Sequence, residues 1–392
     1  MVERNLRESL LARAATYPVV AVTGPRQSGK TTLCQGTFPD HRYVSLEAED
    51  VRRHATTDPR GFLDEYGQGA VIDEVQRAPE LLSYVQGRVD EDPAPGRFIL
   101  TGSQHFGLTE AISQSLAGRV GLLYLLPLGY DELTRFEGHP TDLLDVLWAG
   151  GYPRIHDRGL PADVWTRDYF ATYVQRDVRQ VLEVRDLESF STFVGLAAGR
   201  TGTEVNLSRL GADAGVQHNT VRAWLSVLET SFIVTRIRAW RRNLRKQQIK
   251  APKLHFIDSG LVCHLLGIRT PEELRHHPLR GHIFESWVVA EIQKALLHRG
   301  QDPRLSHFRD AQGLEVDLVV EAGTRLILGE VKAGATVVPD YFKGLIRLGD
   351  LLAKADEHRA VESRVVYGGA GRQTWRGIDV VPWDEVAEID WD

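Results

Sequence analysis

The sequence predicts an α/β fold in three consecutive parts, and three observations support this prediction. The first third contains short apolar runs at residues 19–22, 70–72 and 98–101 without polar alternation, which is typical of parallel strands buried on both faces. The middle third has apolar residues at helical spacing, as in residues 164–181. The last third contains an alternating segment, a Gly turn and a second strand between residues 313 and 328. We therefore expect a parallel sheet, a helical middle and a C-terminal α/β part.

Length and composition narrow the classes of protein to which the chain can belong. Of its 392 residues, 42% are hydrophobic and 26% are charged, and no run approaches the ~20 apolar residues of a membrane span. These values predict a folded chain of about two or three domains that does not enter a membrane. Cys34 and Cys263 are too few for a disulfide framework or a cysteine-based zinc site, so we expect a reducing, cytoplasmic location.

A complete phosphate-loop motif follows the first apolar run. The pattern Gly-x-x-x-x-Gly-Lys-Ser/Thr is matched by Gly24, Pro25, Arg26, Gln27, Ser28, Gly29, Lys30 and Thr31, and Thr32 opens a predicted helix. Glycines let backbone N–H groups turn toward phosphate oxygens, and the helix N-terminus adds a partial positive charge. Lys30 is expected to bind the β- and γ-phosphates, and Thr31 to bind Mg²⁺. The motif therefore predicts a site for ATP and Mg²⁺.

Two acidic residues follow the second apolar run. Asp73 and Glu74 come directly after residues 70–72, at the carboxyl end of a predicted strand. An acid at this place can hold Mg²⁺, the role expected of Asp73, and the next acid can deprotonate the attacking water, the role expected of Glu74. Paired acids suit water activation better than phosphoryl transfer to a bound metabolite. A small-molecule kinase is therefore the disfavoured alternative.

Two more polar residues of the first part are candidates for the same chemistry. Ser103 follows the apolar run 98–101, and ligands of open α/β sheets bind at the carboxyl edge. It is expected to contact the γ-phosphate or the water, with an ordinary strand-end turn as the alternative. Arg119 directly precedes the apolar run 120–126, where an arginine can neutralise charge in the transition state. A further strand is predicted over residues 42–46.

The middle of the chain has the outline of a helix-turn-helix. Residues 207–212 and 219–225 read as two short helices on either side of a Gly turn. In a DNA-binding protein, Arg222 and the residues at 217–219 would face the groove. Strands predicted over residues 232–234 and 254–256 would flank a wing, which gives a winged helix.

A basic segment lies between those two strands. The chain has a net charge of −6, yet eight cations and Trp240 occur here without an acidic residue. The eight are Arg236, Arg238, Arg241, Arg242, Arg245, Lys246, Lys250 and Lys253. Phosphate contacts by such side chains would make DNA binding depend on salt. The residues expected to bind nucleic acid are Arg222, Arg241, Arg242, Arg245 and Lys246; a solvated wing and a surface for an acidic protein partner are the alternatives.

The C-terminal third contains a candidate metal site. Glu285 lies near the start of a predicted amphipathic helix. A predicted hairpin brings Asp317 near Glu330 and Lys332, because residues across a hairpin meet and same-face residues repeat every two. The two hairpin carboxylates are expected to hold one or two Mg²⁺ ions, and Lys332 to stabilise the developing negative charge. A cluster of solvated charges without activity is the alternative.

These motifs together resemble a known family. The phosphate loop, the acid pair, the strand end at Ser103 and the Gly118-Arg119 pair are similar to those of prokaryotic AAA-type P-loop ATPases with a C-terminal domain called DUF4143. The resemblance continues through residues 150–154, 173–177, 252–253 and 256–261. It implies Walker A and Walker B roles for Lys30, Thr31, Asp73 and Glu74. It also implies a sensor role for Ser103 and an arginine-finger role for Arg119, within one chain or between subunits of an oligomer.

Glu285, Asp317, Glu330 and Lys332 resemble a second pattern, that of the PD-(D/E)xK nuclease fold. This resemblance implies that Glu285 is a further Mg²⁺ ligand, and it leads us to expect an aromatic residue near His307. We therefore predict an ATP-hydrolysing protein that acts on nucleic acid, with a nucleotide-dependent protein-interaction switch and a silent nuclease-like domain as the alternative. The expected parts are a P-loop ATPase domain over residues 1–135, a helical connector over 136–200, a winged helix over 201–265 and a nuclease-like domain over 266–392.

Overall fold

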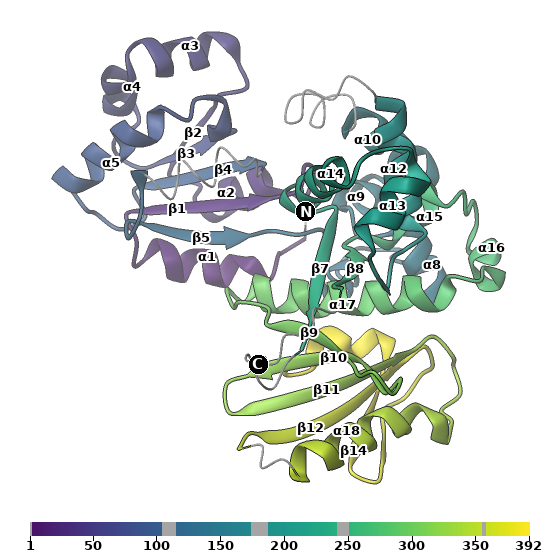
Figure 1. Ribbon diagram of the computed structural model, residues 1–392. Helices are drawn as coiled ribbons and strands as arrows, with labels where there is room; N and C mark the ends of the chain where they lie inside the picture. Colours follow the sequence, from purple (N-terminus) through teal and green to yellow (C-terminus); the bar gives the residue numbers. More distant parts are fainter. Residues whose placement is uncertain (1, 104–114, 174–186, 241–250, 355–357) are drawn as a thin grey trace. The chain divides into compact units, whose positions relative to one another are not determined.

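The computed structural model describes residues 2–103, 115–173, 187–240, 251–354 and 358–392, which form two compact units (Figure 1). Unit 1 comprises Met1–Leu128 with two short later segments, Thr230–Phe232 and Leu297–Gln301. Unit 2 comprises Gly129–Glu229, Ile233–Leu296 and Asp302–Asp392. The predicted first part therefore corresponds to the main segment of unit 1, and the predicted middle and C-terminal parts share unit 2.

Unit 1 is built on a parallel sheet, which in the described part of the chain has five strands in the order β2-β3-β4-β1-β5. The strands are β1 (Val19–Gly24), β2 (Arg42–Ser45), β3 (Ala70–Asp73), β4 (Phe98–Ser103) and β5 (Val120–Tyr124). The helices are α1 (Leu6–Ala14), α2 (Lys30–Thr37), α3 (Glu49–Thr57), α4 (Pro59–Glu65), α5 (Leu81–Glu91) and the short 3₁₀ helix η1 (Val75–Arg77). Because all five strands are parallel, the phosphate loop after β1 and the acid pair at the end of β3 lie at the same edge of the sheet, with β4 between their strands.

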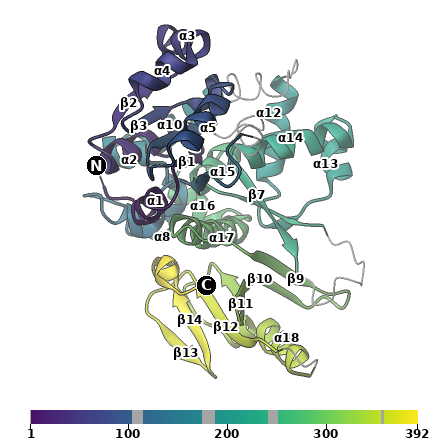
Figure 2. The ribbon, with the colours of Figure 1, turned by 90° about the vertical axis from the view of Figure 1, so that its left-hand side faces the viewer.

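Both faces of this sheet are covered, as the unalternating apolar runs predict. Every residue of β1, β3 and β4 is buried. On one face Leu10 of α1 and Leu33 of α2 pack with Val20. On the other face Leu82 of α5 packs with Ala21, and α3 and α4 cover the same side (Figure 2). The prediction of a parallel α/β sheet is confirmed.

Unit 2 begins with helices and continues into a mixed sheet. Its helices are α7 (Tyr130–Leu133), α8 (Leu143–Ala149), α9 (Pro153–Arg158), α10 (Ala162–Tyr173), α12 (Leu187–Ala198), α13 (Leu207–Ala214), α14 (His218–Thr230), α15 (Ser259–Leu265), α16 (Pro271–His276), α17 (Arg280–His298) and α18 (Lys343–Lys354), with 3₁₀ helices η3 (Pro339–Phe342) and η4 (Trp383–Glu388). Its strands are β6 (Thr203–Glu204), β7 (Val234–Ala239), β8 (Lys253–Phe256), β9 (Leu305–Arg309), β10 (Glu315–Ala322), β11 (Arg325–Lys332), β12 (Ala360–Tyr367), β13 (Gln373–Trp375) and β14 (Ile378–Pro382). The middle is helical, as its apolar spacing predicts.

One sheet crosses the boundary that the sequence places between residues 265 and 266. Across the described residues it has nine strands in the order β13-β14-β12-β11-β10-β9-β7-β8-β6. The junction is a parallel pair in which Arg238 and Ala239 of β7 face Ser306 and His307 of β9. The predicted strand over residues 232–234 is displaced, because Phe232 has a left-handed backbone with a φ of 56° and β7 begins only at Val234. The strands of the middle and C-terminal parts thus form a continuous surface.

Two helices cover the C-terminal part of this sheet. Val289 and Ile292 of α17 belong to a core with Leu318 of β10, whereas Leu345 of α18 packs with Val319 on the opposite face (Figures 1 and 2). The predicted hairpin is confirmed, since β10 and β11 pair antiparallel up to Ala322 and Arg325. No helix among the described residues is long and apolar enough to cross a membrane.

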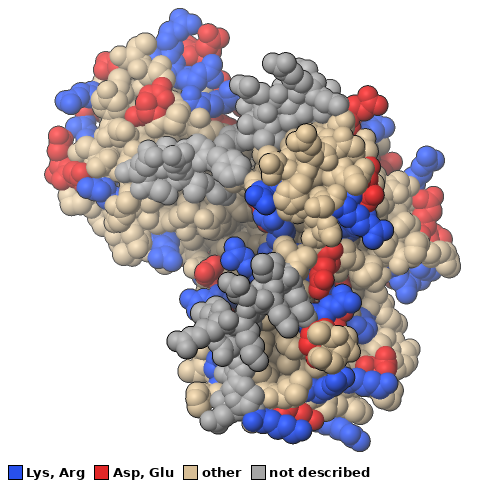
Figure 3. All heavy atoms as spheres, in the orientation of Figure 1, with Lys and Arg blue, Asp and Glu red and all other residues tan. Residues whose placement is uncertain are grey.

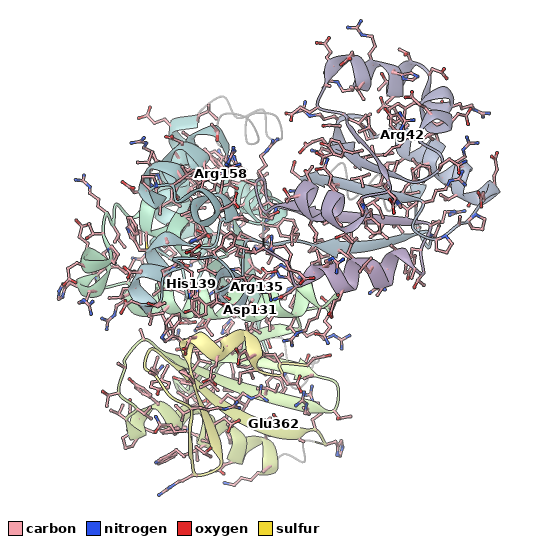
Figure 4. All side chains as sticks on the ribbon, turned by 180° about the vertical axis from the view of Figure 1, so that it is seen from behind. Arg42, Asp131, Arg135, His139, Arg158 and Glu362 are labelled. Carbon is pink, nitrogen blue, oxygen red and sulfur yellow. The ribbon has the colours of Figure 1, made fainter. Side chains whose placement is uncertain are left out.

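Ion pairs also connect neighbouring strands on the solvent side. Glu362, labelled in Figure 4, lies on β12 and pairs with Arg325 of β11 at 3.4 Å and with Arg364 of its own strand at 2.8 Å. Glu362 and Arg325 are partly exposed, and such a pair contributes about 0–1 kcal/mol, whereas Arg364 is buried. They favour the parallel pairing of β11 with β12 and carry no chemistry of their own.

Candidate functional site

The phosphate loop connects β1 to α2 and has a backbone that only glycine permits at its first position. Gly24 has a φ of 152°, and a Cβ atom there would lie 2.1 Å from the carbonyl oxygen of Leu125. Gln27 and Gly29 have left-handed φ values of 60° and 96°. These turns end at Lys30, where α2 begins. The first motif glycine is thus required by close packing and the second by its φ.

Lys30 folds back onto its own loop. Its Nζ atom donates hydrogen bonds to the carbonyl oxygens of Gly24 at 3.1 Å and Pro25 at 2.7 Å. Burial lowers the pKa of Lys30 to about 8, and the nearby Glu74 and Asp73 carboxylates oppose that shift only in part. The ammonium is therefore bound by two carbonyl oxygens of its own loop. A phosphate group bound beside it would raise the pKa of Lys30 and favour the charged form.

Nucleotide binding should consequently take up a proton near pH 8. The phosphates of ATP raise the pKa of Lys30, which is about 8 without them, so roughly half a proton per site is bound at that pH. Titration calorimetry of ATP binding at pH 8, in two buffers with different ionisation enthalpies, measures this uptake. The same titrations at pH 6.5 are the control, because Lys30 is already protonated there. Equal heats of binding in the two buffers at pH 8 would contradict the prediction that Lys30 takes up a proton when it binds the phosphates of ATP.

Three hydroxyl groups surround the Asp73 carboxylate at the end of β3. Thr31 Oγ1 donates to Oδ2 at 3.1 Å, Tyr43 donates its hydroxyl to Oδ2 at 3.0 Å, and Thr101 donates to Oδ1. Burial, together with Asp73, raises the pKa of Tyr43 to about 12. Oxygen ligands are those that Mg²⁺ prefers, so Thr31 and Asp73 form a donor set that fits this ion. The sequence predicts this pair, but Tyr43 and Thr101 carry no motif signal.

Glu74 follows Asp73 with a left-handed backbone, at φ 58° and ψ 40°. Its carboxylate accepts a hydrogen bond from Gln76 Nε2, which also donates to Ser103 Oγ at 3.0 Å. The predicted water-activating acid and the predicted sensor residue are therefore joined through one side chain. Lys30, Thr31, Asp73, Glu74 and Ser103 all lie at the carboxyl edge of the sheet.

Arg4 is a residue of this site that the motifs do not reveal. Its Nη1 atom donates to the carbonyl oxygen of Ser28 at 2.6 Å, and its Nη2 atom donates to that of Leu126 at 2.9 Å. The side chain is buried beside the phosphate loop. It lies far from the loop in sequence and in no recognisable pattern, so only the folded chain identifies it.

Arg119 lies at the opposite edge of the sheet. It precedes β5, whose first residue Val120 pairs with Val19 at the start of β1, whereas the phosphate loop follows the end of β1. Its Nη2 atom donates to Asp90 Oδ2 at 3.0 Å. The predicted arginine-finger role of Arg119 at a nucleotide bound by its own chain is therefore wrong, because the length of β1 separates Arg119 from the phosphate loop. The alternative between subunits stays a prediction.

Two of the three predicted carboxylates of unit 2, Glu285 and Asp317, converge around a lysine together with Glu315, which no motif singles out. Nζ of Lys253, on β8, lies 2.9 Å from Glu285 Oε1, 2.9 Å from Glu315 Oε1 and 3.3 Å from Asp317 Oδ1. Lys253 is only 3% exposed. These carboxylates raise its pKa despite its burial. We name Lys253, Glu285, Glu315, Asp317, Glu330 and Lys332 the carboxylate cluster.

The hairpin residues complete this cluster as predicted. Nζ of Lys332 lies 2.5 Å from Glu330 Oε1 and 3.6 Å from Asp317 Oδ2, and the backbone N–H of Val331 donates to Asp317 Oδ2 at 3.0 Å. Burial, followed by repulsion from Asp317, raises the pKa of Glu285 to about 8 and that of Glu330 to about 7. The positive charges of Lys253 and Lys332 therefore compensate only in part for the burial and mutual repulsion of the cluster carboxylates.

The cluster does not fit the Mg²⁺ ion that the sequence suggests for Glu285, Asp317 and Glu330. Within the described ranges no group of three or more His, Cys, Asp or Glu side chains is arranged to hold a metal ion. The reason is physical, since the Lys253 ammonium already lies against Glu285 and Asp317, where a cation would bind. Sequence analysis places Lys253 in the basic segment, and that assignment is wrong because the side chain is buried among acids. His307, where an aromatic residue is expected, is fully buried on β9.

The helix-turn-helix residues lie on the surface of unit 2. Gly215 ends α13 with a left-handed φ of 70°, and α14 begins three residues later. Gln217, Asn219 and Arg222 are exposed. Trp240 is buried and donates its Nε1–H to Glu321 at 3.2 Å, so it offers no face for a base. On the face drawn in Figure 3, described Lys and Arg side chains lie among Asp and Glu side chains.

The rest of the basic segment divides in two. Arg236 is paired with Glu229, with Nε 2.6 Å from Oε1, so this cation is neutralised. The other residues expected to bind nucleic acid, Arg241, Arg242, Arg245 and Lys246, lie outside the described residues.

The parallel sheet, the phosphate loop and the acid pair define unit 1 as the nucleotide-binding domain of a P-loop ATPase. Residues 16–134 match the family described as AAA domain, residues 140–272 a domain of unknown function, DUF8612, and residues 280–386 the domain of unknown function DUF4143. The chain belongs to the family of P-loop ATPases in which an AAA domain precedes a DUF4143 domain.

The chain is also similar to two curated proteins and to a solved structure. An uncharacterised protein of Mycobacterium tuberculosis and one of Mycobacterium bovis are each 30% identical to the chain over 344 residues, which is 86% of this chain and 75% of the relative. Among solved structures, a Walker-type ATPase of Pyrococcus abyssi is similar, at 15% identity and a TM-score of 0.44, over 66% of this chain and 94% of that one.

Proposed function

We propose that the protein hydrolyses ATP with Mg²⁺ at the carboxyl edge of the unit 1 sheet. The observation that supports this most is the Asp73 carboxylate, 3.1 Å from Thr31 Oγ1 and followed directly by Glu74. Backbone N–H groups of the loop and Lys30 bind the phosphates, and Thr31 and Asp73 hold the metal. The bound metal neutralises charge on the phosphoryl oxygens. Glu74 accepts a proton from the attacking water.

We further propose that unit 2 binds DNA. The succession β6, α13, α14, β7 and β8, with β8 antiparallel to both other strands, supports a winged-helix assignment. The exposed Gln217, Asn219 and Arg222 share the amino-terminal part of α14, which in such readers enters the major groove. The segment that joins β7 to β8 contains Arg241, Arg242, Arg245 and Lys246, which suit phosphate contacts.

The carboxylate cluster favours a binding role for the C-terminal part over a cutting role. The Lys253 ammonium, 2.9 Å from Glu285 and 3.3 Å from Asp317, supplies the positive charge that a metal would supply in a nuclease. We therefore propose a silent nuclease-like domain. A nucleotide-dependent switch whose unit 2 binds a protein is the second candidate, and it differs from the first in its indifference to DNA.

One assay tests these proposals together. ATP turnover of the full chain in Mg²⁺ is measured with and without single- and double-stranded DNA, and the same samples are run on a gel. We expect DNA to stimulate turnover, Arg222→Ala to weaken that stimulation, and no strand to be cut. Arg372→Ala, an exposed arginine of the same unit, is the matched control. Raising the salt should reduce stimulation, because each phosphate contact adds about 0.9 to the salt slope.

Each other outcome overturns one proposal. Turnover that is indifferent to DNA favours the protein-interaction switch. Cleavage by the unaltered chain that is lost in Asp317→Ala contradicts the silent cluster. Absence of any ATP turnover contradicts the ATPase assignment itself.

A further inference from the structure

Gln76 lies at the centre of the hydrolytic site, yet no motif role is assigned to it. It belongs to η1, the turn that follows β3. Its Nε2 atom donates to Glu74 Oε2 and, at 3.0 Å, to Ser103 Oγ. This orientation of the amide is the favourable one, since its oxygen would be repelled by the Glu74 carboxylate. Gln76 therefore connects the ends of β3 and β4 at the carboxyl edge of the sheet.

The backbone and the second amide atom add two independent observations. Glu74 has a left-handed conformation, which is unfavourable in a non-glycine residue and persists where the surroundings enforce it. That turn folds Gln76 back against Glu74. Among the described residues, the Oε1 atom of Gln76 is buried without a hydrogen-bond partner. A buried acceptor without a donor is unfavourable, so a donor that reaches this atom when the substrates bind would satisfy it.

We propose that Gln76 orients the attacking water in ATP hydrolysis, an inference that rests on the proposed function. Nε2 fixes the Glu74 carboxylate, and Oε1 accepts one hydrogen bond from the water while Glu74 accepts the other. The water oxygen then forms a bond to the γ-phosphorus as its bond to the β–γ bridging oxygen breaks. One water proton passes to Glu74, the electron pair of the broken bond leaves on ADP, and Gln76 keeps its protons throughout.

This arrangement explains why an amide stands at the position. A carboxylate could not donate to Glu74, and a shorter side chain would not reach both Glu74 and Ser103. A hydrocarbon would leave Ser103 and Glu74 without their common donor. Glutamine alone among side chains of this length offers a donor and an acceptor at neutral pH.

The test uses the full chain and three variants, Gln76→Ala, Gln76→Glu and, as matched control, Gln68→Ala. Gln68 is exposed in the loop before β3, at the other end of that strand. We expect Gln76→Ala to lower kcat by about 10²–10³-fold while the Kd for a fluorescent ATP analogue changes by less than about threefold. Gln68→Ala should match the unaltered chain. Unfolding temperatures are recorded for all variants.

The Gln76→Glu variant keeps the size of the side chain and gives a readout that a structural role would not move. Its carboxylate cannot donate to Glu74, so kcat should fall as it does in Gln76→Ala while KM and the Kd for the ATP analogue stay unchanged. A Gln76→Ala variant as active as Gln68→Ala, or one that raises KM alone, would overturn the inference while leaving the ATPase intact. If Glu74→Gln also retains full activity, the proposed function itself is wrong.

Discussion

Replacing Glu74 by Gln should reduce ATP turnover by about 10²–10⁴-fold while ATP binding is retained. The amide has nearly the same size as the carboxylate but cannot accept the water proton. Lys30, Thr31 and Asp73, which bind the phosphates and Mg²⁺ in the proposed function, are unchanged. Single-turnover release of phosphate and equilibrium binding of ATP, measured on the same preparation, separate the two effects.

The control for this prediction is Glu80→Gln, an exposed carboxylate shortly after η1, which should leave turnover unchanged. A Glu74→Gln variant that traps ATP in a folded chain supports water activation by Glu74. If the Glu74→Gln variant instead transferred phosphate to a metabolite at an undiminished rate, the protein would be a small-molecule kinase. That result would contradict the assignment as an ATPase.

Replacing Lys253 by Met should destabilise unit 2 by about 3–5 kcal/mol, because it leaves buried carboxylates without their cation. The effect should grow with pH. Burial and Asp317 raise the pKa of Glu285 to about 8 and that of Glu330 to about 7, and loss of the ammonium raises both further. Between about pH 4.5 and pH 8 the folded variant then binds more protons than its unfolded chain, so its stability falls as pH rises. Urea unfolding at pH 5.5 and pH 8.5 measures the difference.

The exposed Lys343, on α18 of the same unit, supplies the control Lys343→Met, for which little change is expected. A second readout is Mn²⁺ binding without nucleotide. The Lys253→Met variant should gain a site that the unaltered chain lacks, since Glu285, Glu315 and Asp317 lose their internal cation. Mn²⁺ binding by the unaltered chain that disappears in Asp317→Ala would contradict the silent cluster.

Local signals predicted much of unit 1. The phosphate loop, the acid pair and the buried apolar strands each occupy consecutive residues, so their chemistry is visible without knowledge of the fold. The partners of Asp73 were not predictable in this way. Tyr43 and Thr101 reach it from two other strands, and Arg4 reaches the loop from the N-terminus. Their roles depend on the order of strands in the sheet, which no single segment determines.

The same distinction holds in unit 2. The β10–β11 hairpin and the position of Glu330 and Lys332 follow from a short turn and the two-residue period of strands. Lys253 was misassigned because its neighbours in sequence are cations, whereas its neighbours in space are acids from α17 and β10. The pairing of β7 with β9, which joins the two predicted domains, likewise links segments far apart in the chain.

That pairing has a consequence for biosynthesis. A ribosome adds about 5–20 residues per second, so β7 emerges several seconds before β9 and spends that interval as an unprotected sheet edge. Lys253 is likewise synthesised before Glu285, Glu315 and Asp317, the carboxylates with which it pairs. The α13–α14 segment is therefore synthesised before the strand that completes its sheet, and β7 gains this partner only after β9 has emerged.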